Sequence, residues 1–146
     1  MSSLVKTMVV PLTTLLLVGF TSQGKPIEIM PEADECATCT MAISNVPLSA
    51  ELILSNRTVA KFDDIGCMVA YWKQKRIRES QVQGAWVHDL KTKNWLAVSK
   101  ATFAKSTYPT PMRYGILAFA KPEDVKTLDA KYKAKVVTWS SLVTGK

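Results

Sequence analysis

The sequence is poor in the side chains from which proteins usually build metal centres and catalytic sites. Its 146 residues include one histidine, His88, and three cysteines. A structural zinc site normally needs a second ligand pair such as CxxC or HxxxH, and here Cys67 and His88 stand alone. No phosphate loop, cofactor fingerprint or Ser-His-Asp order is present. These absences disfavour a zinc module and the common enzyme classes, and we expect a protein that is not an enzyme.

The chain also lacks a hydrophobic run long enough to cross a bilayer, which takes about 20 apolar residues. Its longest run, Met8 to Phe20, is thirteen residues long and contains Pro11 and two threonines. Lys6 precedes this run and the small, polar residues TSQG follow it. That order is typical of an export signal. We predict that residues 1–24 are an export signal, cleaved after Gly24, with a retained N-terminal anchor as the less favoured alternative.

The remaining segment, residues 25–146, is long enough for one domain with its own core. Its lysines are spread along residues 61–146, and the whole chain carries a net charge of +7. A basic surface favours anionic partners or membrane headgroups. No arginine-rich helix with interleaved aromatic residues appears, so nucleic acid is not expected as a partner.

The first half of this domain has a clear alternation of patterns. Two β-rich runs within residues 50–62 flank the turn Ser-Asn-Arg and predict a hairpin. Residues 63–79 begin with two acids and end in Lys and Arg, as a helix does. At helical spacing, one face of that helix collects the apolar side chains that would pack on the sheet. These are Ile65, Met68, Val69 and Trp72.

The second half repeats the order weakly. GAWVHDL and NWLAVS flank KTK as a second hairpin, and a short helical piece is expected at residues 100–105. A strand YGILAFA and a helix opened by Pro122 follow, and the end, AKVVTWSSL, fits a strand or an amphipathic turn. Hairpin followed by helix thus occurs twice, which predicts an α+β fold of two small ββα-type units sharing a core.

The segment ECATCTM, residues 35–41, places Cys36, Cys39 and Met41 within six positions. Thiolate and thioether together form a soft ligand set that prefers Cu(I) to hard ions. Three other interpretations stay open at this point: a zinc site, a structural disulfide between the two cysteines, and a thioredoxin-like redox pair. The redox motif would require CxxC at a helix N-terminus after a buried strand, and the preceding EIMPEADE is poor in strand formers.

Four segments occur in the order and at about the spacing seen in the NosL family: CATCTMAIS, KFDDIGCMVAYW, WVHDL with NWLAVSKATF, and TPMRYGILAF. Over residues 34–140 the chain therefore resembles NosL proteins. The resemblance implies a Cu(I)-binding accessory lipoprotein of nitrous oxide reductase maturation, without catalytic turnover. It also implies a NosL/MerB-like fold of paired ββα-type units.

Three positions depart from the family pattern. Thr40 stands where glycine is common, and a β-branched residue there would be strained if the backbone needs a positive φ. Arg113 stands where glycine often follows TPM. Phe20 replaces the cysteine of a lipobox-like LLLVGF, so that no lipid can attach there.

Carried over from the family, the expected Cu(I) ligands are Cys36, Cys39 and Met41, with Met112 closing the site from the second unit. Cys67 is expected to be structural and His88 to be non-ligating. Asp63 and Asp64 are expected to cap the helix that follows them.

These observations predict an exported Cu(I) metallochaperone, periplasmic or at the outer face of the cytoplasmic membrane, where the N-terminus could associate with the membrane. It would deliver copper to a cuproenzyme, by resemblance nitrous oxide reductase or its membrane assembly complex. The alternative from another class is a thiol-disulfide oxidoreductase that uses the Cys36–Cys39 pair.

Overall fold

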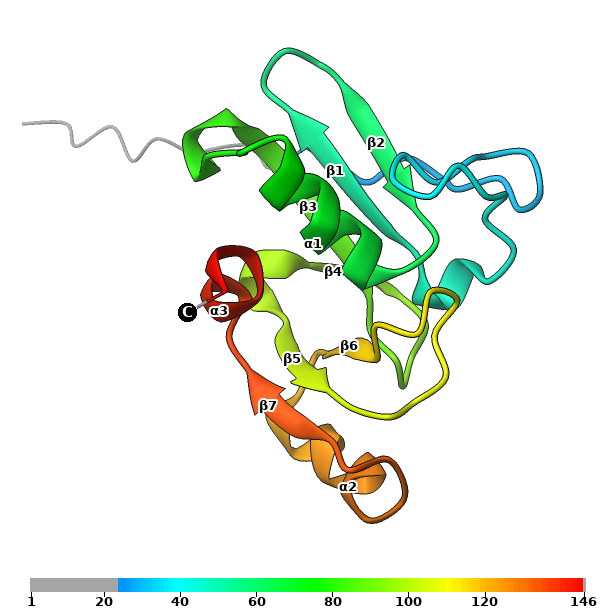
Figure 1. Ribbon diagram of the computed structural model, residues 1–146, viewed down its shortest axis with the longest axis vertical. Helices are drawn as coiled ribbons and strands as arrows, with labels where there is room; N and C mark the ends of the chain where they lie inside the picture. Colours follow the sequence, from blue (N-terminus) through cyan, green and yellow to red (C-terminus); the bar gives the residue numbers. More distant parts are fainter. Residues whose placement is uncertain (1–23, 146) are drawn as a thin grey trace, which may run out of the picture.

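The computed structural model describes residues 24–145; apart from Gly24, the predicted export signal lies outside the described residues. Figure 1 shows two small sheets, one in the upper half of the view and one in the lower half, with helix α1 in front of the upper one. The strands are β1 Ala50–Leu54, β2 Val59–Phe62, β3 Val82–His88, β4 Trp95–Ala97, β5 Thr102–Lys105, β6 Ile116–Phe119 and β7 Lys135–Val137. The α-helices are α1 Ile65–Gln74, α2 Lys126–Tyr132 and α3 Trp139–Thr144, and short 3-10 turns are η1 Val46–Leu48, η2 Glu79–Gln81, η3 Val98–Lys100 and η4 Pro122–Val125.

The strands form two antiparallel sheets. The first has the order β2-β1-β3-β4 and the second the order β6-β5-β7. The α+β class predicted from the sequence is confirmed. The second predicted hairpin does form, as β3 and β4, but it extends the first sheet because β3 pairs with β1.

One detail of the expected organisation is wrong. The segment predicted as a short helix at 100–105 is mostly strand β5, which lies at the centre of the second sheet and pairs on both sides. The C-terminal segment, for which a strand or an amphipathic turn was expected, contains strand β7 followed by helix α3. Central position in a sheet depends on the partners β6 and β7, which no local pattern reveals.

Helix α1 begins where its acidic start predicts. The carboxylate of Asp64 caps the helix by accepting a hydrogen bond of 2.6 Å from the backbone N–H of Gly66. The predicted apolar face is confirmed as buried: it consists of Ile65, Met68, Val69 and Trp72. Trp72 packs edge-on against Trp139 of α3, with ring centroids 5.5 Å apart, so α1 contacts elements of both units.

One hydrophobic cluster joins the two sheets, as the shared core predicts. It runs from Leu52 and Phe62 through Met68 of α1 to Phe103 and Ile116 of the second sheet. Neighbouring strand residues point to opposite faces. The opposite face of the second sheet accordingly packs a smaller cluster, which includes Ala104, Leu117, Phe119 and Val125.

The N-terminal segment is fastened to the first sheet by polar contacts. Glu51 of β1 is fully buried and accepts a 2.9 Å hydrogen bond from the backbone N–H of Ile27. The ammonium group of Lys61 on β2 binds the carboxylate of Asp34 at 2.7 Å and the carbonyl oxygen of Glu28 at 2.9 Å. These contacts fix the segment that leads into the cysteine loop. Within residues 24–145, no helix is both long and apolar enough to span a membrane.

Glu51 makes stability depend on pH. Burial raises the pKa of Glu51, so the folded state binds a proton more readily than the unfolded state, and stability falls as pH rises through this range. We expect Glu51→Gln to gain free energy of unfolding relative to wild type as pH increases from about 4 to 7. Urea unfolding followed by tryptophan fluorescence measures this difference, with Glu79→Gln at an exposed glutamate as control. A difference that stays constant with pH would contradict the expectation.

Candidate metal centre

Residues 36–41 form a tight turn that precedes η1 and strand β1 in the sequence. The backbone N–H of Cys36 donates to the carbonyl of Met41 at 2.9 Å, and that of Thr40 donates to the carbonyl of Cys36 at 2.9 Å. The turn is held to the first unit by the N–H of Ala37, which donates to the carbonyl of Lys61 at 2.8 Å. In addition, the Thr38 hydroxyl donates to the carbonyl of Cys67 at 2.8 Å.

The turn closes with Thr40 at a φ of 61°, and Arg113 has a φ of 59°. Both values lie in the left-handed region that glycine occupies without steric cost. Thr40 thus has the positive φ at which a β-branched residue is strained, and Arg113 shows the same conformation. At both positions the preference of the resembled family for glycine has a backbone reason.

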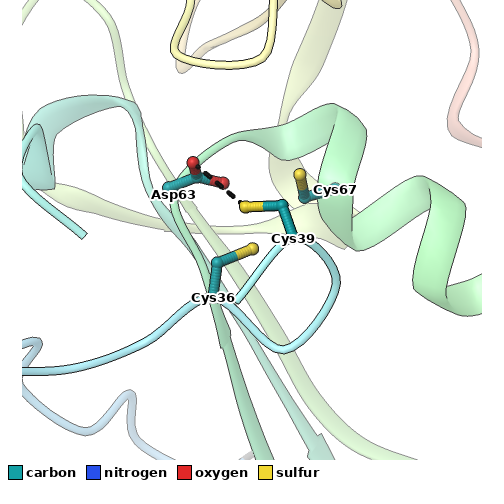
Figure 2. Close-up of side chains that lie close together, drawn as sticks. All are labelled: Cys36, Cys39, Asp63 and Cys67. Atoms are coloured by element: carbon teal, nitrogen blue, oxygen red, sulfur yellow. Dashed lines mark hydrogen bonds between the residues drawn. The ribbon is translucent and has the colours of Figure 1, made fainter. Parts of the chain in front are cut away.

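This turn places two cysteines beside a third that comes from helix α1. The sulfur atoms of Cys36, Cys39 and Cys67 and a carboxylate oxygen of Asp63 all lie within 4.8 Å of one another. Figure 2 shows the three thiols turned toward one another, with Asp63, the first residue after β2, beside them. The side chains of these four residues, called the thiol cluster below, therefore meet from two segments about 25 residues apart in the sequence.

The cluster is mostly shielded from solvent. Cys36 and Cys67 are each 1% exposed, whereas Cys39 is half-buried. The Cys39 thiol donates to Oδ2 of Asp63 at 3.5 Å. Oδ1 of Asp63 is buried and has no hydrogen-bond partner among the described residues. An unpaired buried carboxylate oxygen is costly, so this carboxylate favours a binding partner with positive charge.

One of the three thiols, that of Cys36, has a pKa low enough to be deprotonated at neutral pH. A hydrogen bond from the Cys67 thiol, reinforced by backbone N–H groups of the turn, lowers the pKa of Cys36 to about 6 in spite of burial. The same hydrogen bond, together with burial, raises the pKa of Cys67. Burial also raises the pKa of Cys39. The pair Cys36–Cys67 thus shares one proton at neutral pH, and Cys36 is the thiolate of the pair.

Three sulfurs and a carboxylate can hold a thiophilic metal ion. Thiolates select Cu(I) and Zn(II) among the common ions. Three thiolates suffice for Cu(I), whereas the addition of a carboxylate oxygen completes the four ligands that Zn(II) prefers. The donor set therefore fits two ions, Cu(I) and Zn(II). They differ in whether the carboxylate of Asp63 binds the metal.

The structure brings together two of the four predicted ligands, Cys36 and Cys39. Met41 follows them in the same turn with its side chain 57% exposed, and Met112 lies on the loop between β5 and β6, 36% exposed. The backbone N–H of Met112 donates to Oδ2 of Asp64 at 3.1 Å, which ties this loop to the start of α1. The thioethers of both residues stay predicted ligands.

Sequence reasoning missed Cys67 and Asp63 as members of the cluster. Cys67 was expected to be structural, although it lies in the first turn of α1, away from the centre of the apolar face, and that position was a signal. Asp64 is the helix cap as predicted, but its neighbour Asp63 faces the thiols instead. His88 is not part of the cluster: it is buried, stacks on Trp95 with ring centroids 3.9 Å apart and contacts Ser49.

Comparison with known proteins gives a family match and a structural match. The sequence model of the NosL family matches residues 26–144. A solved structure, that of the copper chaperone NosL from Shewanella denitrificans, superposes with a TM-score of 0.71 and covers 84% of this chain and 98% of its own. Its sequence is 18% identical, so this likeness shows the fold. No curated protein sequence matches the chain significantly.

The shared proton of Cys36 and Cys67 predicts a thiolate at unusually low pH. We expect the reduced, metal-free protein to gain thiolate absorbance at 240 nm with a midpoint at pH about 6. Cys36→Ser should remove this step and Cys39→Ser should keep it. Cys67→Ala should move it up toward the ordinary cysteine value of about 8.5, because the donated hydrogen bond is lost. The pKa of Cys36 is lower in the folded than in the unfolded chain, so Cys36 adds stability as the pH rises from about 6 to about 8.5. A first midpoint above about 8 in the wild type would contradict the assignment.

Proposed function

This chain belongs to the NosL family, because the family's sequence model spans nearly all of the described residues, and from that membership we propose that it binds and transfers copper as Cu(I) at the thiol cluster. NosL is a family of copper chaperones and not of enzymes, and the chain is accordingly a non-enzymatic protein that passes copper to a partner. The observation that carries the proposal is the convergence of three sulfur atoms within 4.8 Å.

The chemistry of the cluster supports the monovalent ion. Cu(I) is soft, accepts two or three thiolates, and does not need the fourth, hard ligand that Zn(II) prefers. Cys36 offers a thiolate at neutral pH, whereas Cys39 and Cys67 release their protons as the metal binds. Asp63 then accepts hydrogen bonds or balances charge beside the sulfurs rather than binding Cu(I) directly.

The uneven burial of the three thiols supports transfer. Cys36 and Cys67 are sealed from solvent and hold the ion, whereas Cys39 is accessible. A sulfur donor of the partner approaches from the Cys39 side, and the copper exchanges one ligand at a time without being released as a free ion. Met41, exposed two residues beyond Cys39, is placed to offer a thioether during this exchange. Met112 remains a proposed ligand from the neighbouring loop.

The identity of the partner and the compartment belong to the same proposal. By resemblance, the copper acceptor is nitrous oxide reductase or its membrane assembly complex. The basic, apolar and small-residue order of residues 1–24 supports export, and Phe20 argues against a lipid anchor. We propose a periplasmic location or one at the outer face of the cytoplasmic membrane.

The family assignment and the geometry disfavour the alternative, a thiol-disulfide oxidoreductase. In a thioredoxin-like site the attacking cysteine is exposed at a helix N-terminus. Here Cys36, the thiol with the lowered pKa, is 1% exposed and lies in a turn that precedes a strand. A disulfide substrate therefore has no direct path to the activated sulfur.

Anaerobic titration of the reduced protein with Cu(I) against a chromophoric Cu(I) chelator tests the proposal. We expect one Cu(I) per chain and an affinity that falls at least about tenfold, or about 1.4 kcal/mol, in each of Cys36→Ser, Cys39→Ser and Cys67→Ser. Met41→Ala should fall less than these, and Met30→Ala, at another exposed methionine, serves as its control. X-ray absorption should show a first shell of sulfur.

A matched substitution separates the two candidate ions. Asp63→Asn keeps the size of the side chain but weakens its oxygen as a metal ligand. We expect this variant to lose Zn(II) affinity and to retain Cu(I) affinity within about threefold, because only Zn(II) needs the fourth ligand. A first shell dominated by nitrogen or oxygen, or a Cys67→Ser variant with wild-type Cu(I) affinity, would refute the proposed site.

A further inference from the structure

The loop of residues 106–115 connects β5 to β6 and reaches across to the metal-binding unit. Figure 1 shows this lime-to-yellow segment running from β5 up to the N-terminal end of α1 and back to β6. Its base is closed by the N–H of Ser106, which donates to the carbonyl of Gly115 at 2.8 Å, and its tip is a turn in which the N–H of Arg113 donates to the carbonyl of Thr110 at 2.9 Å. The loop is therefore ordered by its own bonds.

One carboxylate fastens the tip of this loop to the first turn of α1. Asp64 is fully buried; its Oδ1 accepts from the N–H of Gly66 at 2.6 Å, and its Oδ2 accepts from the N–H of Met112 at 3.1 Å. The residue that caps the helix thus also fixes the backbone two positions before Tyr114. The positive φ of Arg113 turns the chain between them.

Gly66 provides the seat on which Tyr114 rests. A Cβ added at Gly66 would lie far inside van der Waals contact with Cβ, Cγ and Cδ2 of Tyr114. The ring therefore lies directly on the backbone of α1, next to Cys67. Alanine is the better helix former at such a position, so the absence of a side chain here serves the contact with Tyr114 and not the helix.

Two further observations show that Tyr114 lies near the cluster and also reaches solvent. The pKa of its phenol is raised, first by partial burial and then by the negative charge of Cys67, Asp64 and the other two thiols, so the ring lies within electrostatic reach of the cluster. Its side chain nevertheless remains 42% exposed. An open cavity of about 470 Å³ adjoins Tyr114; Gly66 and Ala70 line it, and Cys67 does not.

We propose that Tyr114 gates the thiol cluster: seated on Gly66 it covers Cys67, and when its ring swings off this seat it opens the α1 side of the site to an incoming metal carrier. The adjoining cavity gives the ring an open position. Asp64 is the positioning residue that returns the loop to its closed state. This inference rests on the proposed copper function, since it adds a second approach to the site besides the half-buried Cys39.

A gate is distinguished from a ligand by what its removal changes. Loss of a ligand lowers the affinity for Cu(I), whereas loss of a gate raises the rates of binding and release together and leaves their ratio unchanged. A purely structural role would instead lower the stability of the whole chain. Each of these outcomes has its own measurement.

The first experiment uses the reduced, metal-free protein and needs no copper. A pulse of iodoacetamide followed by trypsin and mass spectrometry reports on Cys67 alone, because the peptide of residues 62–73 holds this cysteine and neither of the others. We expect Tyr114→Ala and Gly66→Ala each to raise the alkylation rate of Cys67 at least fivefold, and Tyr114→Phe, which keeps the ring, to stay near wild type. Trp95→Ala, which removes a half-buried ring stacked on His88 at the edge of the first sheet, is the control.

The second experiment measures Cu(I) transfer from the loaded protein to a chromophoric chelator by stopped flow. We expect Tyr114→Ala to speed both loading and release several-fold with an unchanged dissociation constant. Thermal melts of every variant accompany both experiments, so that a general loss of folding is distinguished from a local exposure of Cys67.

The outcomes separate this inference from the copper function itself. Cys67 alkylation within twofold of wild type in both Tyr114→Ala and Gly66→Ala overturns the gate, even if copper binds as proposed. A higher dissociation constant for Cu(I) in Tyr114→Ala also overturns the gate, because Tyr114 would then be a binding residue. If wild type binds no Cu(I), the proposed function fails, whereas the alkylation rates still decide whether Tyr114 covers Cys67.

Discussion

The hydrogen bonds at the junction of β2 and α1 hold the site together. The carboxylate of Asp64 accepts the N–H of Gly66 and the N–H of Met112, so one buried side chain caps the helix and anchors a loop from the other unit. On the opposite side, the Thr38 hydroxyl and the carbonyl of Cys67 join the cysteine turn to the same helical turn. Burial raises the pKa of Asp64, and the hydrogen bonds that its carboxylate accepts oppose this rise by stabilising the charged form.

The cluster built on this junction, which we propose as the copper site, combines two opposed requirements of a metal carrier. Buried thiols bind a soft ion tightly because water cannot compete for it, and a fully buried site would not release the ion. Here Cys36 and Cys67 are sealed while Cys39 reaches solvent. The pKa values of the three thiols differ in the same way: Cys36 is a thiolate at neutral pH, whereas Cys39 and Cys67 have raised pKa values and keep their protons.

Several features of the fold follow from local patterns alone. The acidic start and the apolar face of residues 63–79 are sufficient to predict α1, because capping and helical periodicity act within a few residues. The positive φ of Thr40 could likewise be anticipated from a glycine preference in the family it resembles. Strand β5 could not be predicted in this way. A run of four residues has no helical or strand pattern of its own, and its structure is fixed by pairing with β6 and β7. For the same reason the second hairpin was predicted correctly but its membership of the first sheet was not.

The sequence by itself determined that residues 36–41 carry soft donors, because two thiols and a thioether within six positions are visible without any fold. Only the tertiary structure decided that Cys67 and Asp63 complete the cluster and that Tyr114 rests beside it. These residues are separated from the cysteine turn by about 25 and 75 positions, and their approach depends on how β2 ends, how α1 begins and where the 106–115 loop returns. Spacing along a chain fixes contacts within a turn, whereas contacts between segments arise from burying their shared core.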